Sequence, residues 1–448
     1  MFLESDVIKL NFNDTSNKIV PNNRQLNILE MGYYNFIHFG LNTYTGKEWG
    51  DGNVDPKNFK LKQLDTDKWV QDLMSTGSKG VIITAKHHDG FCLFNSKYTD
   101  YCIRNTPYKS GQGDIVKELS ESCKKFGFKL GIYLSPWDRH EPTYGTEAYN
   151  DYFCNQLEEL CTNYGDIFCF WFDGACGEGK NGKKQCYDWE RYYATIHKYQ
   201  PNAALSNCGP DIRWIGNESG KARKAEWSVV PKRLQVYDEV MRQSQQEEGA
   251  FKMLSQIDHT DKRLGDRDLI SENEQLCYWP SEMDVPITYV GWFYRKYFEM
   301  FMTRSVKNLM ECYYTSVGNN ATLLVNIPPN KKGDLPKKFI KRLQTVSRRI
   351  ENDFAERVDC KQKQIDEYTY ELNFNTSCIQ KAILREDITQ SQRVEKFEII
   401  ANGVTVFKGE TIGYKKICFF NSVKTNKIIV KITQSRNAPV LLETGLYK

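Results

Sequence analysis

Several residues that could carry chemistry stand at the ends of short apolar runs. Asp173 ends the run that starts at residue 167, and the glycine after it would let a substrate approach. A carboxylate in such surroundings is costly to bury without partners. The aspartate is therefore either hydrogen-bonded for structure or kept for catalysis, and its position alone does not decide between the two.

Imidazoles stand at the ends of two other apolar runs. His38 closes the first of them, and His87 and His88 follow the second in the segment His-His-Asp-Gly-Phe. Adjacent residues point in different directions, and no His-x-His or His-x-x-x-His spacing is present, so the segment indicates sugar hydroxyl recognition rather than a metal site. Glu48 and Trp49 would add a carboxylate and an aromatic face, which suit a carbohydrate.

A glycosidase acting on such a sugar needs a second carboxyl group beside the first. The candidates after Asp173 are Glu178, Glu218, Glu226 and Glu282. Glu218 lies between glycines in the segment Trp-Ile-Gly-Asn-Glu-Ser-Gly, which could carry a carboxyl group to the substrate. Spacing alone does not choose between the four.

The elements around these residues alternate between strand and helix over the first three quarters of the chain. Apolar runs predict strands at residues 33–39, 80–86, 129–135, 167–173, 203–207 and 321–327, and helical spacing predicts helices at 64–76, 114–126, 147–164 and 188–199. The strands are continuously apolar, as strands buried on both faces are. Repeated βα units over about 300 residues favour a (β/α)8-like TIM barrel, with His38, His87 and Asp173 all at its carboxyl face.

Two regions depart from this pattern. Residues 208–290 carry many charges and few apolar runs, so we expect long loops over the barrel mouth with strands six and seven among them. In the last quarter of the chain, short apolar runs separated by turn signals such as Asn402-Gly403 predict an all-β sandwich. The predicted domains are a barrel at residues 1–345 and a C-terminal β-sandwich at residues 346–448. Because all nine Trp precede the sandwich, we expect it to support the barrel rather than to bind sugar.

The composition is that of an ordinary globular chain. Of 448 residues, 40% are hydrophobic and 26% are charged, which excludes general disorder, and the net charge of +4 is too small to indicate a nucleic-acid or membrane-surface protein. No signal peptide and no apolar stretch of about 18 residues is recognisable, so we expect a cytoplasmic protein without membrane contact. The 14 Cys are scattered without a C-x-x-C pair, which favours free thiols in a reducing compartment.

Four segments combine these candidates: Asn-Phe-Ile-His-Phe-Gly at 35–40, Gly-Lys-Glu-Trp-Gly at 46–50, Ala-Lys-His-His-Asp-Gly-Phe at 85–91 and Trp-Phe-Asp-Gly at 171–174. In their order and spacing they resemble the α-L-fucosidases of glycoside hydrolase family 29. Further similar segments run through the barrel and into the sandwich as far as Gly-Leu-Tyr near the end of the chain. The resemblance thus covers nearly the whole sequence.

The resemblance implies a retaining exo-α-L-fucosidase with Asp173 as its nucleophile, acting on a fucosylated oligosaccharide or glycoconjugate without a cofactor or a metal. The positions that would contact fucose are His38, Glu48, Trp49, His87, His88, Tyr133, Trp171 and Trp292. The acid/base position varies within the family. The segment Gly-Asn-Glu resembles the subfamily that cleaves α-1,3- and α-1,4-linked fucose from Lewis-type glycans, in which the acid/base falls on Glu218. The two catalytic carboxyl groups of a retaining enzyme lie roughly 5–5.5 Å apart.

Three alternatives stay open at this point. A fucosidase of broader linkage range would share the same segments. A non-catalytic fucose-binding protein could lose a catalytic carboxylate, but both Asp173 and Glu218 are present, which disfavours it. A metal-dependent hydrolase would use His87, His88 and Asp173 as ligands, and chelators would then abolish its activity.

Overall fold

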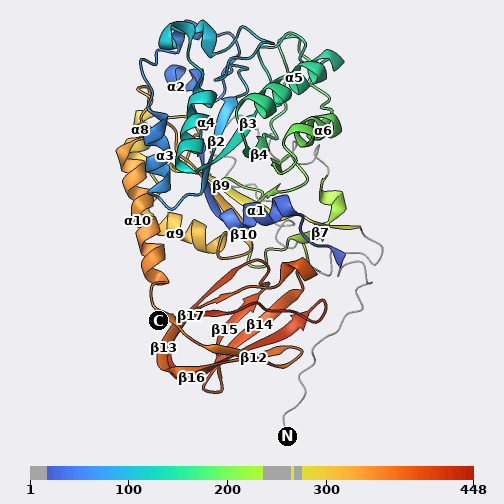
Figure 1. Cartoon of the computed structure of the whole chain (residues 1–448), viewed down its shortest axis with the longest axis vertical. Coiled ribbons are helices and arrows are strands. Elements are labelled where there is room, and N and C mark those ends of the chain that lie inside the picture. Colours follow the sequence, from blue (N-terminus) through green and yellow to red (C-terminus); the bar gives the residue numbers. More distant parts are fainter. Residues whose placement is uncertain (1–17, 236–263, 267–274) are drawn as a thin grey trace.

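The computed structural model describes residues 18–235, 264–266 and 275–448, which form a parallel barrel and an antiparallel β domain (Figure 1). The barrel sheet has the strand order β5-β4-β3-β2-β1-β10-β9-β6. Its strands are β1 (Tyr33–Ile37), β2 (Gly80–Lys86), β3 (Lys129–Leu134), β4 (Ile167–Phe172), β5 (Ala204–Asn207), β6 (Arg213–Trp214), β9 (Ser281–Pro286) and β10 (Ala321–Asn326). Between β5 and β6, the backbone N–H of Asn207 donates to the carbonyl of Ile212 at 2.9 Å. The barrel is therefore nearly closed, and the predicted (β/α)8-like architecture is confirmed.

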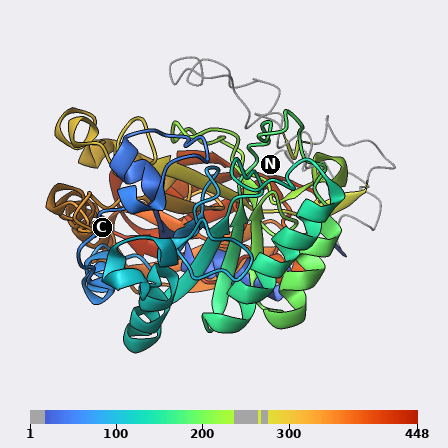
Figure 2. The same cartoon turned by 90° about the horizontal axis from the view of Figure 1, so that it is seen from above.

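Helices follow most of these strands, and most of the helices pack on the outside of the barrel. They are α1 (Asn23–Met31), α2 (Leu41–Thr45), α3 (Thr66–Met74), α4 (Ile115–Phe126), α5 (Glu147–Asn163), α6 (Trp189–Tyr199), α8 (Lys296–Phe301), α9 (Val306–Thr315) and α10 (Lys337–Asp353). Helix α3 packs beside α4, and α5 packs beside α6. Figure 2 shows most of these helices around the outer side of the barrel, whereas α1 contacts β5 and β10 and its residues Ile28 and Met31 belong to the cluster inside the barrel.

Helix α4 shows how local sequence sets the ends of an element. The side chain of Asp114 accepts a hydrogen bond from the backbone N–H of Lys117, which satisfies one of the free donors at the start of the helix. Gly127 ends the helix in the left-handed conformation, with a φ of 66°. Both ends lie where the sequence predicted them.

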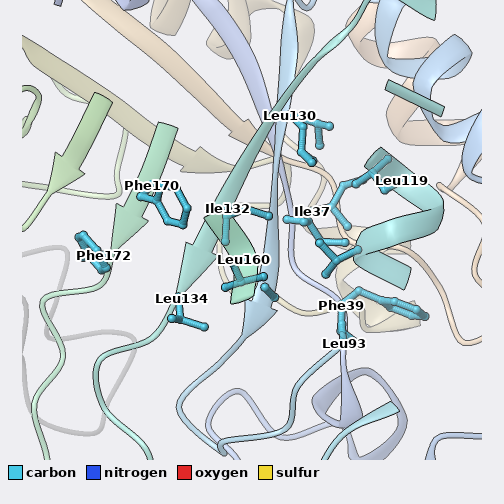
Figure 3. Packing of buried hydrophobic residues seen from close by; sticks show 14 of the residues in the cluster. Ile37, Phe39, Leu93, Leu119, Leu130, Ile132, Leu134, Leu160, Phe170 and Phe172 are labelled. Atoms are coloured by element: carbon cyan, nitrogen blue, oxygen red, sulfur yellow. The ribbon is translucent and has the colours of Figure 1, made fainter. Parts of the chain in front are cut away.

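Apolar side chains pack on both faces of the barrel strands. Outside the sheet, Ile132 of β3 belongs to one large cluster with Leu119 of α4 (Figure 3). Inside the barrel, Phe36, Tyr133 and Trp171 belong to a second cluster that is rich in aromatic rings. Because side chains alternate across a strand, these continuously apolar runs supply both clusters. The inner cluster gives the barrel mouth an aromatic floor.

The region that the sequence predicted as long loops contains both missing barrel strands. Strands six and seven of the prediction are β6 and β9. A small antiparallel pair, β7 (Val229–Pro231) with β8 (Leu276–Tyr278), lies between them in the chain. Residues 236–263 and 267–274 of this region lie outside the described residues.

The C-terminal domain consists of antiparallel strands, as predicted, and Figure 1 shows it at the end of the barrel opposite α2. Its strands are β11 (Arg357–Val358), β12 (Lys361–Asp366), β13 (Thr369–Leu384), β14 (Val394–Ala401), β15 (Val404–Glu410), β16 (Lys416–Ser435) and β17 (Gly445–Tyr447). Helix α10 runs through residue 345, and its buried residues Phe339, Leu343 and Val346 belong to the barrel's outer cluster. The helix therefore continues the barrel core past that residue, and the first strand of the β domain begins at Arg357.

The β domain contacts the barrel at the amino-terminal end of β10. The side chain of Asn320 donates to the carbonyl of Glu226 at 2.9 Å and accepts from the backbone N–H of Tyr414 at 2.7 Å. Lys416 donates from Nζ to Asn319 at 2.6 Å and to the carbonyl of Lys224 at 3.3 Å. The β domain thus contacts residues 224–226, which lie between β6 and β7 in the chain.

Two findings concern the chain as a whole. All 14 Cys lie in the described ranges, where none of them forms a disulfide, and most of them are buried. Within those same ranges, no helix is long and apolar enough to cross a membrane.

Candidate active site

The carboxyl ends of β1 to β4 bring most of the predicted site residues together at the barrel mouth. Parallel pairing sets Tyr133 of β3 opposite Trp171 of β4, and their rings stack with centroids 5.5 Å apart. The ring of His87 stacks on the other side of Tyr133, with centroids 5.6 Å apart and an interplanar angle of 10°. The ring of His38 lies 5.7 Å from that of His87. These rings form the floor of the candidate site.

Asp173 lies one residue beyond β4 and has three polar neighbours. The hydroxyl of Tyr133 donates to Oδ2 at 2.9 Å, and the backbone N–H of Ala175 donates to Oδ1 at 2.8 Å. The Nε2 atom of His88 lies 3.7 Å from Oδ2. The side chain keeps 23% of its surface exposed, so its oxygens are oriented by the protein and still reachable by a substrate.

The histidines are held neutral by their surroundings. Burial lowers the pKa of His38 to about 3 and also lowers the pKa values of His87 and His88. The hydroxyl of Ser135 donates to a backbone carbonyl and lies 2.7 Å from His88 Nδ1, so Nδ1 carries the hydrogen and Nε2 is free to accept one. His38 Nδ1 lies 3.0 Å from the side-chain oxygen of Asn326, with the same consequence. Neutral imidazoles with a free acceptor nitrogen can bind sugar hydroxyls.

Glu48 and Trp49 reach the site from the loop after α2. Glu48 accepts a hydrogen bond from the backbone N–H of Trp292 and lies 3.7 Å from the guanidinium of Arg295. Burial raises the pKa of Glu48. The ring of Trp49 packs edge-on against that of His88, with centroids 5.7 Å apart. Trp292 itself packs over His38 at 5.0 Å and so closes another side of the cluster.

Glu218 lies in the loop that follows β6 and is half-buried. Its Oε2 accepts a hydrogen bond from Nε1 of Trp292 at 3.1 Å. Burial raises the pKa of Glu218 to about 7, and the negative charges of Asp173 and Glu48 add to this effect, while Trp292 and Arg304 oppose it. A carboxyl group with this pKa is protonated in a large share of molecules at neutral pH, as a general acid must be.

The other three carboxyl groups have different surroundings. Glu178 is exposed on the loop after β4. Glu226 is fully buried and accepts from the guanidinium of Arg213, with Arg223 also near. Glu282 is buried on β9 and accepts from Nε1 of Trp171 at 2.7 Å and from the hydroxyl of Tyr34. Of the four candidates, Glu218 is the one whose pKa is raised by Asp173.

Three further residues, for which the sequence predicted no role, shape this cluster. Asn326, at the end of β10, holds His38 and also donates to the carbonyl of Trp292 at 2.7 Å. Asp284 on β9 accepts from Nε1 of Trp214 at 2.6 Å, and burial together with the charge of Glu218 raises its pKa well above the usual range. Arg304 donates to the backbone of the Glu218 loop. Asn326 and Asp284 are polar residues of barrel strands. Because polar residues at the carboxyl ends of such strands build the site, their strand positions could have identified them in the sequence.

Glycoside hydrolases use a reachable carboxylate together with a second carboxyl group of raised pKa, and the barrel mouth presents both kinds of group among aromatic rings and neutral imidazoles. Within the described ranges, no group of three His, Cys, Asp or Glu could hold a metal ion together.

Comparison with known proteins identifies the family. The sequence profile described as "Alpha-L-fucosidase" matches residues 14–352. The chain is 32% identical to alpha-L-fucosidase 1 of Arabidopsis thaliana, over 96% of this chain and 87% of that protein. A solved structure of a putative alpha-L-fucosidase from Bacteroides ovatus is 40% identical and superposes with a TM-score of 0.84, covering 100% of this chain and 77% of that one. A Ruminococcus gnavus GH29 fucosidase, solved in complex with fucose, is 26% identical with a TM-score of 0.79 and covers 99% of this chain and 97% of its own.

The chain belongs to the α-L-fucosidase family, glycoside hydrolase family 29. Its activity is that of an α-L-fucosidase, and a fucosylated glycan is its class of substrate. Members of the family hydrolyse the glycosidic bond with retention of configuration.

Proposed function

We propose that this enzyme removes terminal α-1,3- or α-1,4-linked L-fucose from Lewis-type oligosaccharides or glycoconjugates, with Asp173 as nucleophile and Glu218 as acid/base. The observation that carries the catalytic assignment is the electrostatic pairing of the two groups. Asp173 stands ready as a hydrogen-bonded, reachable carboxylate, and its charge helps to keep the proton on Glu218.

In the first step, an oxygen of Asp173 bonds to the anomeric carbon while the bond from that carbon to the leaving oxygen breaks. Glu218 gives its proton to that oxygen. The Asp173 ester carries no charge, so the raised pKa of Glu218 falls, which suits its second role as base. In the second step, Glu218 takes a proton from water, the water oxygen attacks the anomeric carbon, and Asp173 leaves as a carboxylate. Two inversions give net retention.

The remaining site residues would hold the sugar. Acceptor nitrogens on His38, His87 and His88 suit hydroxyl groups, and the carboxylate of Glu48 suits a further pair of hydroxyls. The faces of Trp49, Trp171 and Trp292 suit the apolar C–H surface of a deoxy sugar. Tyr133 would keep Asp173 oriented beneath the anomeric carbon.

The linkage preference is supported by the loop that carries Glu218. The side-chain oxygen of Asn217 accepts from the backbone N–H groups of Ser219 and Lys221, both at 3.1 Å, and so folds the loop compactly around Glu218. In the Gly-Asn-Glu segment, the asparagine therefore fixes the shape of the loop that carries the glutamate. A compact wall beside the leaving group could contact the neighbouring galactose of a branched glycan, and such remote contacts contribute to kcat/KM only when that galactose is present.

The role of Glu218 is tested by chemical rescue of Glu218→Ala. An aryl fucoside with an acidic phenol needs little protonation, so formation of the fucosyl-enzyme should survive, while a trisaccharide should lose on the order of 10²–10⁴-fold. Azide should then attack the intermediate and give a fucosyl azide of the same anomeric configuration as the substrate. Glu178→Ala, which removes an exposed carboxylate, is the matched control and should behave as the unmodified enzyme. If Glu218→Ala gave no fucosyl azide, the assignment of Glu218 as the acid/base would be wrong.

The linkage preference is tested by comparing kcat/KM on a Lewis-type trisaccharide and on 2'-fucosylated lactose. A clear preference for the trisaccharide supports the proposal. Equal values on both substrates would instead indicate the broader linkage range, with the catalytic roles unchanged.

A further inference from the structure

We propose that Arg304 is a positioning residue for the acid/base, because its buried guanidinium fixes the backbone of the loop that carries Glu218. This inference rests on the proposed role of Glu218. Arg304 lies between α8 and α9, far from the loop in the sequence, and its side chain is 1% exposed. It would act through Glu218 without touching the substrate.

The guanidinium of Arg304 joins three segments at once. Its Nη2 donates to the carbonyl of Glu218 and its Nη1 to the carbonyl of Ser219, both at 3.2 Å. Its Nε donates to the carbonyl of Pro286, at the end of β9, at 2.8 Å. Nη1 also donates to the side chain of Asn308 in α9 at 2.9 Å. The planar guanidinium offers its donors in a fixed fork, so these bonds set the position of the loop relative to the barrel and to α9.

The loop depends on such contacts because it has no regular hydrogen-bonding pattern of its own. Between β6 and β7, residues 215–228 form neither helix nor strand. The backbone passes so close to α9 that a Cβ at Gly220 would lie 2.8 Å from the sulfur of Cys312 and 3.5 Å from Nη1 of Arg304. Gly220 also has a φ of +82°, which favours glycine. The glycine thus allows the loop backbone to approach α9 closely enough for its carbonyl groups to accept hydrogen bonds from the guanidinium.

The charge of Arg304 has a second effect. Its hydrogen-bond acceptors are neutral oxygens, and within the described ranges no carboxylate forms an ion pair with it. The positive charge therefore acts on Glu218 without a counter-ion in contact, and it lowers the pKa of that carboxyl group against the effect of burial. The hydrogen bonds and the charge can be separated, because lysine supplies a charge without the fork and methionine supplies neither.

The test compares Arg304→Lys and Arg304→Met with the unmodified enzyme on two substrates across the pH range. In both variants, we expect kcat/KM on the trisaccharide to fall by about 10–10²-fold, part of the contribution of general acid catalysis, and to fall much less on an aryl fucoside with an acidic phenol. In Arg304→Met, the alkaline limb of the trisaccharide profile should move to higher pH, because Glu218 then holds its proton more tightly. In Arg304→Lys, that limb should stay in place.

Lys381→Met is the matched control, since Lys381 is also a buried cation that donates to a neutral oxygen, the carbonyl of Asp353, but in the β domain and away from the Glu218 loop. It should lower thermal stability and leave the ratio of the two activities and the alkaline limb unchanged. If Arg304→Met behaves like this control, the positioning role is wrong and Arg304 only stabilises the fold. If Arg304→Met does not fold, the substrate ratio of Arg304→Lys decides in the same way. A failure of the proposed function is recognised separately, because Glu218→Ala itself would then lack the leaving-group dependence and the azide product.

Discussion

The two carboxyl groups proposed as catalytic are held in different ways. Asp173 stands at the end of a barrel strand, between a hydroxyl from the adjacent strand and a backbone N–H two residues further on. Glu218 stands on an irregular loop and is held by Trp292 and Arg304, which come from segments 74 and 86 residues further along the chain. The proposed nucleophile is thus placed by the sheet, and the proposed acid/base is placed by contacts between loops. The position of Asp173 therefore depends on the barrel sheet, whereas the position of Glu218 depends on how loops from distant parts of the chain pack.

Asp173 and Glu218 also differ in their electrostatic surroundings. Asp173 keeps part of its surface exposed, and the donors to both of its oxygens fix its orientation. Glu218 is enclosed beside two other carboxylates, and this enclosure raises its pKa to about 7. The two groups therefore suit the two proposed roles, a reachable nucleophile and a general acid, because their environments differ.

The largest effect should follow from removing the strand-end carboxylate. We expect Asp173→Ala to reduce kcat by at least about 10⁴-fold on an aryl fucoside, because the covalent route through the barrier is lost. Circular dichroism should show that the fold persists. Near-normal turnover by the pure variant would contradict the assignment of the nucleophile.

The pH dependence of the unmodified enzyme tests the loop carboxyl group. Glu218 must be protonated for the first step, and its pKa is raised to about 7, so kcat/KM on a trisaccharide should fall as the pH rises through about 7. The loss should approach tenfold per pH unit, or about 100-fold two units above the pKa. The fall should be weaker for an aryl fucoside with an acidic phenol, which needs little protonation. Identical alkaline limbs for both substrates would count against Glu218 as the acid.

A smaller effect is expected when the hydrogen bond from the adjacent strand to Asp173 is removed. Tyr133→Phe removes the hydroxyl that donates to Oδ2 and keeps the ring that stacks on Trp171. A hydrogen bond to a charged group contributes about 1.5–3 kcal/mol, so we expect a loss of about 10–10²-fold in kcat/KM. The loss should be similar for a trisaccharide and an aryl fucoside, because Tyr133 does not contact Glu218. A loss confined to the trisaccharide would contradict this separation.

The smallest effect should come from Trp292→Phe, which removes one hydrogen bond to Glu218 and keeps an aromatic ring. The backbone N–H that binds Glu48 is unchanged by the substitution. Because the lost bond stabilised the ionised form of Glu218, its pKa should rise and the alkaline limb should move to higher pH. We expect a change of only a few-fold in kcat/KM near neutral pH, a few tenths to about one kcal/mol. An alkaline limb that moves to lower pH would be the contrary result.

Much of the barrel could be predicted from the sequence because its elements are encoded locally. The run at residues 80–86 forms β2 over the same residues, and Asp114 and Gly127 begin and end α4 as expected. The short strand β6 could not be assigned, since two residues give no periodicity to detect. The strand positions of Asp284 and Asn326 could have marked them as site residues, but their partners Trp214 and His38 come from other segments and only the folded chain shows those contacts.

The sequence by itself determined the fold class, the family resemblance and the strand-end position of Asp173, because continuous apolar runs and the residues that end them are properties of short segments. It left four carboxyl groups as candidates for the second catalytic role. Tertiary structure distinguished their environments: Glu226 lies against Arg213, Glu282 lies beneath Trp171, Glu178 faces solvent, and Glu218 lies beside Trp292 within reach of the charge of Asp173. The physical reason is that the proton affinity of a carboxyl group depends on burial and on nearby charges, which only the folded chain brings together.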